Sequence, residues 1–333
     1  MQALIQQIET HYSLTVKNYK VIRDTDKSLV IRLDTSRGKW IGKCLYVSPE
    51  RQEFILDAEE YLRKRGILIP STLPTVQKER YFWWKEYPFV LQRRHDLPVI
   101  TFNTPERLQL TGRTLGRIHA RSIGFSSRHG HLFNGALKWE KDYQDKLAFL
   151  SKWQPCLSDS FSGKIAAICN ALPFFQTAAA TTAKLLLTSP SFAKWIKTPP
   201  EQQFLCHGDF NNGNLLMRKK GLIVIDWEDV RYDFPSKDLS RVLYLLMRKQ
   251  NRWNKSAFLR VLHAYLKENP LSASHQLILY ADLAFPHIVE RFLRKQEYLR
   301  MTHAQVLSFL QRERKKIAYF LQEAKACCQA DFR

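Results

Sequence analysis

The feature that most constrains the fold is a change in hydrophobic periodicity near residue 95 of the 333-residue chain. Before that point short β-rich runs dominate, and the turns between them carry Asp and Gly. After it, apolar residues recur mainly at helical spacing, and we find neither an internal repeat nor a low-complexity linker. The pattern predicts an α+β fold with two lobes: a β-rich N-terminal lobe over residues 1–94 and a larger, mainly helical lobe over residues 95–333.

In the N-terminal lobe, three strands joined by short turns predict an antiparallel meander. A helix follows, because Phe54, Ala58 and Leu62 fall on one face of it. Gly66 and Pro70 end this helical pattern, and two more strands close the lobe. The expected strands cover residues 19–22, 28–33, 39–46, 81–84 and 89–92, and the helix covers residues 49–65.

In the C-terminal lobe, one segment departs from the helical pattern. Between Gln203 and Arg231 the chain alternates strand, loop and strand, and we expect a hairpin around Lys219 to Gly221 that ends at Asp226. A small β lobe with one helix, followed by a helical lobe with an embedded acidic hairpin, is the layout of kinase-like folds. The expected helices lie near residues 105–121, 139–152, 161–185, 237–250, 255–267, 273–298 and 303–328.

The chain carries 52 Lys and Arg residues against 31 Asp and Glu residues, a formal net charge of +21. Such a charge favours anionic partners, such as nucleotide phosphates or an acidic macromolecular matrix. Nucleic acid is disfavoured as a partner, because the basic residues are scattered along the whole chain and no zinc-finger, RNP or long Lys/Arg tract occurs. A solvated basic surface explains the excess more simply than a dedicated nucleic-acid site.

Cysteine usage and hydropathy bear on the location of the protein. The six cysteines form no CxxC pair and show no disulfide-like spacing, which favours a reducing cytoplasm. No apolar run reaches the roughly 18 residues that a membrane-spanning helix needs. The first residues lack a basic start followed by an apolar stretch, so we expect neither a signal peptide nor a membrane partner.

A short polar segment could carry phosphoryl transfer, which needs metal ions, a cation on the phosphates and a carboxylate near the attacking hydroxyl. Asp209 and Asn214 lie on one loop, and Asp226 ends a strand further on. Oxygen ligands of this kind suit Mg²⁺, so we expect Asn214 and Asp226 to bind the metal. Asp209 would orient the acceptor hydroxyl and take its proton, and His207 would support the loop. A turn between strands needs Asp and Asn in any case, but it does not require this whole set at these spacings.

The same segment reads His207-Gly208-Asp209, four residues, Asn214 and then Ile-Asp-Trp with Asp226 at its centre. In this it resembles the aminoglycoside phosphotransferase and choline kinase superfamily, whose signature matches at all of these positions. The resemblance implies a bilobal protein-kinase-like fold that uses ATP and Mg²⁺ as cofactors. Gly208 replaces the catalytic-loop Arg of protein kinases, which favours the branch that phosphorylates small molecules.

Three further segments, Leu115–Ser122, Arg231–Leu239 and Leu283–Pro286, make the chain similar to bacterial spore coat kinase-like proteins of the CotS type. This similarity covers nearly the whole chain. By analogy, Asp238 would hold the catalytic and metal loops in place through hydrogen bonds. His119 lies on the apolar side of its helix, and we interpret it as a buried core histidine rather than a catalytic one.

The expected cation on the phosphates is Lys43, near the end of the third strand. Spacing alone fits a surface lysine on an edge strand equally well, and the family resemblance favours the phosphate contact. Such a lysine pairs with an acid of the following helix. Helical geometry leaves Glu59 or Asp57 for this pair, and we choose Glu59.

The nucleotide site has an expected hinge but lacks an expected loop. We expect the adenine to stack beside the hinge residues Leu91, Gln92 and Arg93. The first hairpin has no glycine-rich loop, whose backbone amides could approach phosphates closely. Side chains such as Lys27 and Ser28 would then take over this work.

These observations predict a spore coat-associated kinase-like phosphotransferase that moves the γ-phosphate of ATP to a hydroxyl of an unidentified small molecule or coat component. The alternative is a kinase-fold coat protein with weak or no catalysis that acts in morphogenesis by binding. An antibiotic-modifying enzyme is disfavoured, because polycationic aminoglycosides require an acidic acceptor site. The expected location is the cytoplasm of the mother cell, with deposition in the spore coat beside other coat proteins or an anionic matrix.

Overall fold

The computed structural model describes residues 1–154 and 163–331. The packing of residues divides the chain into two compact units that interleave along the sequence. The acidic hairpin expected in the helical lobe packs with the N-terminal β structure, and the lobe boundary near residue 94 stays a prediction. Unit 1 comprises Met1–Ile100, Phe125–Phe133 and Asn212–Val230, and unit 2 comprises Thr101–Gly124, Asn134–Asn211 and Arg231–Arg333.

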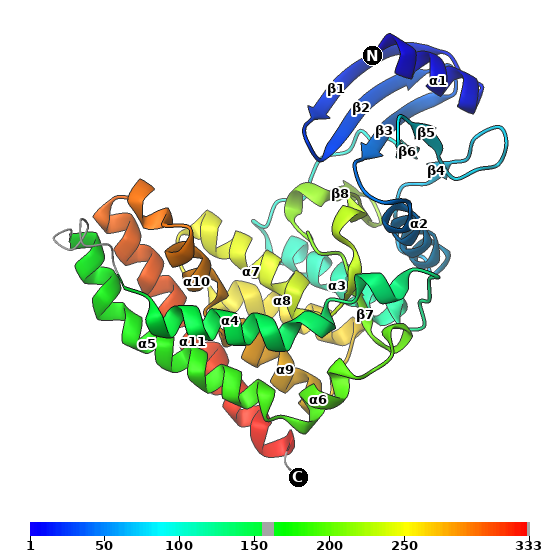
Figure 1. Cartoon of the computed structure of the whole chain (residues 1–333). Helices are drawn as coiled ribbons and strands as arrows, with labels where there is room; N and C mark the ends of the chain where they lie inside the picture. The colour runs from blue at the N-terminus through cyan, green and yellow to red at the C-terminus, as the bar shows by residue number, and fades with distance from the viewer. Residues whose placement is uncertain (155–162, 332–333) are drawn as a thin grey trace. The chain divides into compact units, whose positions relative to one another are not determined.

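Unit 1 contains an antiparallel sheet, two helices and a separate short hairpin (Figure 1). The sheet has the strand order β1-β2-β3-β6-β4, with β5 paired to β6, and β8 pairs with β9. The elements are α1 (Gln2–Tyr12), β1 (Val16–Asp24), β2 (Ser28–Thr35), β3 (Gly38–Leu45), α2 (Pro49–Lys64), β4 (Thr72–Leu73), β5 (Phe82–Trp84), β6 (Tyr87–Arg93), β8 (Leu215–Arg218), β9 (Gly221–Val224) and the 3₁₀ turns Gly130–Phe133, Asn212–Asn214 and Trp227–Asp229.

The meander β1-β2-β3 predicted from the sequence is confirmed, with both strand pairs antiparallel. Along β2, Leu29, Ile31 and Leu33 point to one face of the sheet and share a buried core with helix α1. The sequence interpretation misses this helix, although Leu4 and Ile8 lie one helical turn apart and are fully buried. The other face of the sheet carries both apolar and polar side chains, among them Val30, Ile41 and Lys43.

Unit 2 is mainly helical, with one pair of short antiparallel strands, β7 and β10. Its elements are α3 (Pro105–Ser122), α4 (Trp139–Lys152), α5 (Gly163–Leu187), α6 (Pro190–Ile196), β7 (Phe204–Cys206), β10 (Arg231–Asp233), α7 (Ser236–Gln250), α8 (Lys255–Glu268), α9 (Ala273–Ala284), α10 (His287–Arg294), α11 (His303–Asp331) and the 3₁₀ turns Ala136–Lys138, Pro200–Gln202 and Glu297–Arg300. The α+β, kinase-like fold class predicted from the sequence is confirmed.

One predicted helix of this unit is wrong. The pattern over residues 273–298 predicts a single helix, but the chain breaks at Phe285 and Pro286 into α9 and α10. Phe285 has an extended backbone (φ −63°, ψ 136°), and Pro286 has no N–H to continue the helical ladder. Residues 161 and 162, where the helix expected over 161–185 begins, lie outside the described residues, and the rest of that helix is α5.

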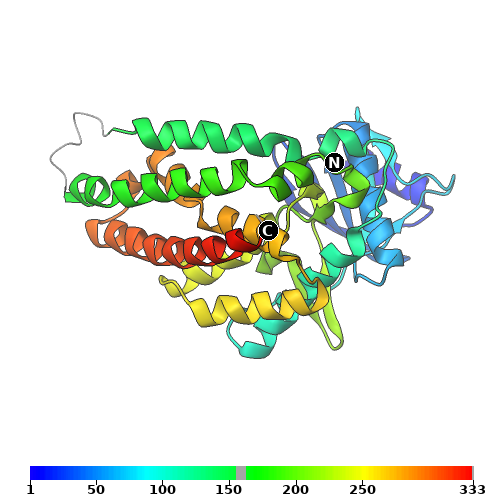
Figure 2. The same cartoon turned by 90° about the horizontal axis from the view of Figure 1, so that it is seen from below.

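Helices α4, α5 and α11 lie side by side, with α5 between the other two (Figure 2). Each buries an apolar stripe. On α5 the stripe includes Phe175 and Ala179, and on α11 it includes Ile317 and Phe320, all less than 2 % exposed. This layer contributes buried apolar residues to the core of unit 2.

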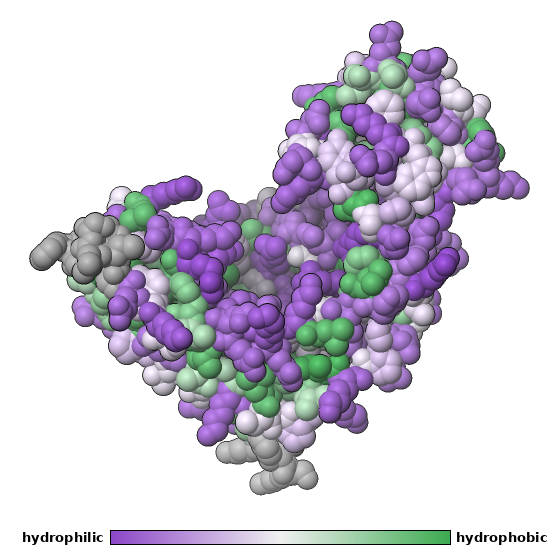
Figure 3. Space-filling model, in the orientation of Figure 1, coloured by the Kyte–Doolittle hydropathy of each residue, from purple (hydrophilic) through white to green (hydrophobic). Residues whose placement is uncertain are grey.

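On the face drawn in Figure 3, hydrophilic residues predominate and hydrophobic ones form small separate patches. Exposed large apolar side chains, such as Trp83 and Leu137, are scattered along the chain. Among the described residues, no helix combines the length and the apolar character needed to cross a bilayer.

Candidate functional site

Lys43 lies on strand β3, on the sheet face opposite helix α1. Side chains alternate along a strand, and the next residue, Cys44, belongs to the core on the α1 side. The Nζ atom of Lys43 donates to Oδ1 of Asp226 at 2.7 Å and to Oε1 of Glu228 at 3.3 Å. Two residues that the sequence assigns to the site, Lys43 and Asp226, therefore meet within unit 1.

The charges in this cluster follow from burial and proximity. Burial disfavours the charge of Lys43, but the carboxylates of Asp226 and Glu228 outweigh it and raise the pKa of the ammonium. Burial also opposes ionisation of Asp226, yet Lys43 and hydrogen bonds lower its pKa to about 2. Burial raises the pKa of Glu228 against the pull of Lys43, and the neighbouring Asp226 adds to the rise. At neutral pH a charged lysine thus faces an ionised Asp226.

Asp226 follows strand β9 in a backbone conformation that L residues rarely adopt. Its φ of 68° and ψ of 59° lie in the left-handed region, which Asp tolerates better than most residues. The backbone N–H of Ile225 donates to the carbonyl oxygen of Asn214 at 3.0 Å, which joins the two segments that carry the expected metal ligands. Carboxylate and amide oxygens are the donors that Mg²⁺ prefers, so Asp226 and Asn214, with Glu228 beside the same lysine, fit such an ion.

Glu59 does not form the expected ion pair with Lys43 in this structure. Its carboxylate oxygens both accept from Nε2 of Gln92, at 2.9 Å each, and burial raises its pKa. The other candidate acid, Asp57, pairs with Arg80 at 2.6 Å. Among the described residues, the ion pairs of Lys43 are those with the two acids after strand β9. Gln92 and Glu59 therefore act together as a buried hydrogen-bonded pair.

A cavity of about 250 Å³ in unit 1 borders the Lys43–Asp226 ion pair. Apolar side chains of the sheet lie on its wall, and apolar side chains at the β8–β9 hairpin add to the lining. A flat aromatic base fits such walls, while the ion pair marks the polar end. The apolar wall residues include Val30 and Ile41 of the sheet and Leu216 and Ile225 at the hairpin.

The three expected hinge residues have different environments. Gln92 and Arg93 line this cavity, whereas Leu91 is fully buried in the core beside α1 and does not line it. Strand alternation explains why Gln92 faces the cavity and Leu91 does not, because neighbouring residues of β6 point to opposite faces. A stacking role for the Leu91 side chain is therefore not available in this structure. Gln92 is the member of this hinge whose side chain faces the cavity, whereas the guanidinium of Arg93 lies over the ring of Trp40, 5.3 Å from its centroid.

Arg23 of strand β1, which the sequence interpretation misses, also lines the cavity. Its Nη1 atom lies 3.5 Å from Oε2 of Glu228 and donates to Oγ of Ser28 at 3.4 Å. Ser28 itself is only 1 % exposed, and neither Ser28 nor Lys27 lines the cavity. Of the basic residues in and beside the first hairpin, Arg23 is the one that faces the cavity.

The loop that carries Asp209 belongs to unit 2 and follows strand β7. Oδ2 of Asp209 accepts from Nδ2 of Asn211 at 2.9 Å, and Nη2 of Arg241, on helix α7, lies 3.8 Å from Oδ1. The backbone N–H of Asp209 donates to Nδ1 of His207 at 3.2 Å. The Asp209 side chain remains 35 % exposed. The loop thus holds a carboxylate in a defined orientation and leaves it accessible.

Asp238 holds the start of this loop through hydrogen bonds to its backbone. Its Oδ2 atom accepts from the backbone N–H of His207 at 2.7 Å, and its Oδ1 atom accepts from that of Gly208 at 2.9 Å. Gly208 has a φ of 84°, a conformation that suits glycine. Burial disfavours the carboxylate, but the hydrogen bonds and charges of the surrounding histidines lower the pKa of Asp238. The sequence expectation of structural support agrees with this geometry, and its functional weight stays a proposal.

A chain of side chains extends this support into the core. Nδ2 of Asn269 donates to the hydroxyl of Tyr265 at 2.6 Å, and that hydroxyl lies 3.0 Å from Nδ1 of His119. Nε2 of His119 lies 3.1 Å from Oδ2 of Asp238. The two ring nitrogens of His119 therefore lie within hydrogen-bond distance of Tyr265 and of Asp238. His119 is fully buried, as expected of a core histidine.

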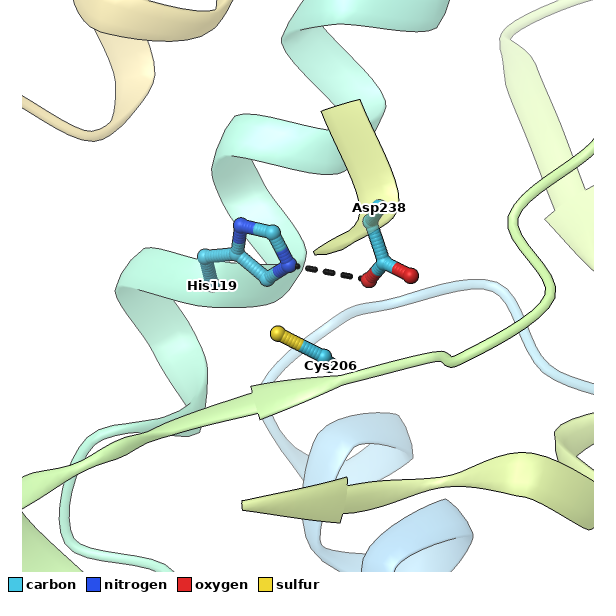
Figure 4. A group of neighbouring side chains, drawn as sticks. All are labelled: His119, Cys206 and Asp238. Carbon is cyan, nitrogen blue, oxygen red and sulfur yellow. Dashed lines mark hydrogen bonds and ion pairs between the residues drawn. The ribbon is translucent and has the colours of Figure 1, made fainter. Parts of the chain in front are cut away.

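His119, Cys206 and Asp238 converge from α3, β7 and α7, close enough to suggest a metal site (Figure 4). Their other contacts argue against one. Burial raises the pKa of the Cys206 thiol well above its usual range, and its Sγ atom donates to the carbonyl of Phe234 at 3.2 Å. A metal would need a thiolate, and it would have to displace the hydrogen bonds of Asp238. The cluster is better described as a buried hydrogen-bonded support.

The structure places the expected residues in two groups. Those expected at the nucleotide and metal lie in unit 1, and those expected at proton transfer and loop support lie in unit 2: Lys43, Glu59, Leu91, Gln92, Asn214 and Asp226 in the first, His207, Asp209 and Asp238 in the second. Glu228, Arg23 and Arg241 are absent from the sequence prediction. Only Glu228 had a local signal, two residues after Asp226, while the two arginines come from distant segments.

Comparison with known proteins gives the class to which this fold and these residues belong. Residues 15–278 match the phosphotransferase enzyme family, and this match covers well over half of the chain. The fold is the kinase-like one seen in aminoglycoside phosphotransferases. The chain belongs to the phosphotransferase enzyme family.

More particular similarities lie within that family. The chain is 23% identical to spore coat protein S of Bacillus subtilis (strain 168) over 297 residues, 86% of this chain and 82% of that protein. An aminoglycoside phosphotransferase from Alicyclobacillus acidocaldarius superposes with a TM-score of 0.74 at 15% identity, covering 98% of this chain and 96% of that one. An amicoumacin kinase in complex with AMP-PNP, Ca²⁺ and Ami gives a TM-score of 0.62 at 18% identity, covering 95% and 92%.

Proposed function

We propose that this chain is an ATP- and Mg²⁺-dependent phosphotransferase that moves the γ-phosphate to a hydroxyl group. The observation that carries the proposal is the Lys43–Asp226 pair at the edge of a cavity with apolar walls. A buried cation and a carboxylate that stays ionised are the groups that nucleotide phosphates and their metal ion require. The solved amicoumacin kinase with AMP-PNP supports the same kind of ligand.

The cavity suggests how the nucleotide binds. The base would lie between the apolar side chains of the sheet and those of the β8–β9 hairpin, with the polar edge of the base near Gln92. Lys43 and Arg23 would face the phosphates, which replace the acids that hold them in the free protein. Asp226 and Asn214 would hold Mg²⁺, which neutralises the charge of the phosphate oxygens when bound.

The transfer step needs one carboxylate beside the acceptor. The acceptor oxygen forms a bond to the γ-phosphorus, the bond from that phosphorus to the bridging oxygen breaks, and ADP leaves. The proton of the acceptor hydroxyl passes to Asp209, whose orientation depends on Asn211 and on the His207 loop. Arg241, 3.8 Å from Asp209, is a positioning residue that helps to orient the Asp209 carboxylate.

The acceptor is a hydroxyl-bearing small molecule or a component of the spore coat. Similarity to spore coat protein S supports the coat as the location, reached from the cytoplasm of the mother cell. A solved spectinomycin phosphotransferase in complex with ADP and spectinomycin, 16% identical to this chain, supports a small-molecule acceptor. The net charge of +21 disfavours a polycationic acceptor.

The proposal is tested in two stages. ATP with Mg²⁺ should raise the thermal midpoint, because a ligand at about 100 times its Kd stabilises the folded state by about 2.7 kcal/mol. A screen of hydroxyl-bearing metabolites for ATP consumption would then identify the acceptor. Asp209→Asn should reduce turnover at least about 100-fold and leave the nucleotide shift intact. The matched control is Asp145→Asn, which changes an exposed acid of α4.

A second candidate function is a coat protein that acts by binding without catalysis. The observation in its favour is the first hairpin, where the backbone N–H of Thr25 donates to the carbonyl of Ser28 and no glycine offers an amide to phosphates. Absence of any thermal shift at millimolar ATP and Mg²⁺ would favour this function and remove the enzyme proposal. Full turnover by Asp209→Asn would instead remove Asp209 from its role.

A further inference from the structure

A basic groove lies between helices α3 and α8 of unit 2, apart from all the residues discussed so far. Its volume is about 710 Å³, the larger share of its lining comes from α8, and α3 forms the opposite wall. Four cationic side chains line it, and each is exposed: Arg113 on α3, and Lys255, Arg260 and Lys267 on α8.

The groove is long because its residues repeat along α8. Lys255, Leu259 and Lys267 all line the groove, and they belong to a row of four-residue steps that winds gradually around α8. From the first to the last of them the helix rises by about 18 Å, at about 1.5 Å per residue. An extended polypeptide covers that distance with about five or six residues, at about 3.3 Å each. The dimensions thus suit a short extended segment.

Close packing of the two helices makes the groove a fixed feature. A Cβ atom at Gly112 would lie 2.2 Å from the carbonyl oxygen of Val261, and one at Gly116 would lie 2.6 Å from that of Tyr265. These two glycines let the helix backbones approach each other, so the floor of the groove is set by backbone contacts. A partner would bind a surface that is already formed, with little ordering cost.

Two acids lie near the cations of the groove, Glu106 near Arg260 and Glu268 near Arg113, but neither forms an ion pair with them. Among the described residues, none of the four forms an ion pair within 4 Å. The nearby acid Glu268 is bound by Arg117 at 2.8 Å. Lys255 lies over the ring of Tyr319, 4.3 Å from its centroid, which holds the ammonium in place and leaves its charge unneutralised. The groove therefore presents a concentrated positive field to solvent.

We propose that this groove docks an acidic polypeptide segment of a partner protein. Charge complementarity requires an anionic occupant. Of the described residues that line the groove, none has an aromatic ring other than the imidazole of His263, so bases of a nucleic acid would find little on which to stack. Leu259 and Ala264 give the groove an apolar floor, which suits alternating acidic and apolar side chains of a peptide. The inference goes beyond the proposed function and does not depend on nucleotide binding or turnover.

The test uses the full chain and a fluorescent peptide of about eight residues, rich in Glu with Leu interspersed. Binding is followed by anisotropy. The triple charge reversal K255E/R260E/K267E should weaken binding at least about tenfold. The matched control, K184E/K315E/K325E, makes the same change in net charge on exposed lysines of α5 and α11 and should weaken binding less than about threefold. Equal losses in both variants would overturn the proposal, because they would show attraction to the overall charge.

Two further measurements keep the proposal testable if the groove variant fails to fold. In the unaltered protein, bound peptide should protect Lys255 and Lys267 from acylation and leave Lys184 and Lys315 reactive. Unprotected groove lysines under saturating peptide would overturn the proposal. Inorganic polyphosphate and a single-stranded oligonucleotide of equal charge serve as competitors, and tighter binding of either one at the groove would assign the surface to a different class of partner.

Discussion

Replacing Asp238 by alanine removes one buried carboxylate that accepts three hydrogen bonds, from the backbone of His207, from the backbone of Gly208 and from His119. Each hydrogen bond to a charged acceptor contributes about 1.5 to 3 kcal/mol, and each buried donor left unpaired costs about 1 to 3 kcal/mol. Against this, the variant no longer buries a charge, which relieves several kcal/mol. We expect the free energy of unfolding to fall by about 3 to 5 kcal/mol.

This loss is large enough to measure directly. For a chain of this size it corresponds to a decrease of about 4 to 7 °C in the thermal midpoint. Asp238→Asn should cost less, because the amide keeps one acceptor oxygen. It should still destabilise the protein, because the NH₂ group of the amide would face N–H donors. Thermal unfolding followed by circular dichroism, together with urea titration, gives both values. The nucleotide-induced shift should persist, since the Lys43–Asp226 pair belongs to unit 1.

The matched control for this prediction is Asp145→Ala. Asp145 is an exposed acid of α4 whose ion pair with Lys141 spans one helical turn. Such a pair contributes less than about 0.5 kcal/mol. If Asp238→Ala unfolds within about 1 kcal/mol of Asp145→Ala, the carboxylate does not hold the loop as argued. That result would mean that water can replace the three hydrogen bonds that Asp238 accepts.

Three more outcomes are expected. Lys43→Ala should weaken ATP binding at least about tenfold, whereas Lys39→Ala, at an exposed position of the same strand, should not; equal effects would contradict the assignment. Burial lowers the pKa of His287 from 6.5 to about 4, so the unfolded chain binds a proton at a higher pH than the folded chain does. The free energy of unfolding should therefore fall as the pH drops from about 6.5 to about 4. His287→Gln should flatten that part of the stability–pH curve, and an unchanged slope would refute the assignment. Gly112→Ala places a Cβ atom 2.2 Å from the carbonyl oxygen of Val261 and should lower the free energy of unfolding by about 1 to 3 kcal/mol. A urea titration measures this loss, and an unaltered urea midpoint would exclude it.

The sequence predicts well those parts of the site that are fixed by short-range order. Asp209 and Asn214 belong to one short segment between strands, and the hairpin that leads to Asp226 has its turn where Lys219 to Gly221 predict it. Strand alternation also places Lys43 away from the core. Each of these features depends on neighbours within a few residues, which a single sequence records.

Partners across the fold are predicted poorly, because they depend on how distant elements pack. Helix geometry leaves Glu59 or Asp57 as the partner of Lys43, and it cannot detect that Gln92 occupies the carboxylate of Glu59. Arg241 is adjacent to Asp209 only through the placement of α7. Leu91 is a different case, since strand alternation from Phe89 could have shown that it points into the core.

The surroundings of Arg23 suggest how phosphates could bind without a glycine-rich loop. Backbone amides bind phosphates only where no side chain separates them, which is why such loops need glycine. A guanidinium reaches phosphate oxygens from a strand without that closeness, and it offers several donors in one plane. Arg23 lines the same cavity as Lys43, and Glu228 contacts both cations. Both charges are therefore already oriented toward one carboxylate, which a triphosphate with its metal ion can replace. Because the first hairpin has no glycine-rich loop, phosphate binding would depend on side chains instead of backbone amides. Whether Arg23 binds the triphosphate therefore distinguishes an enzyme from a protein that acts by binding alone.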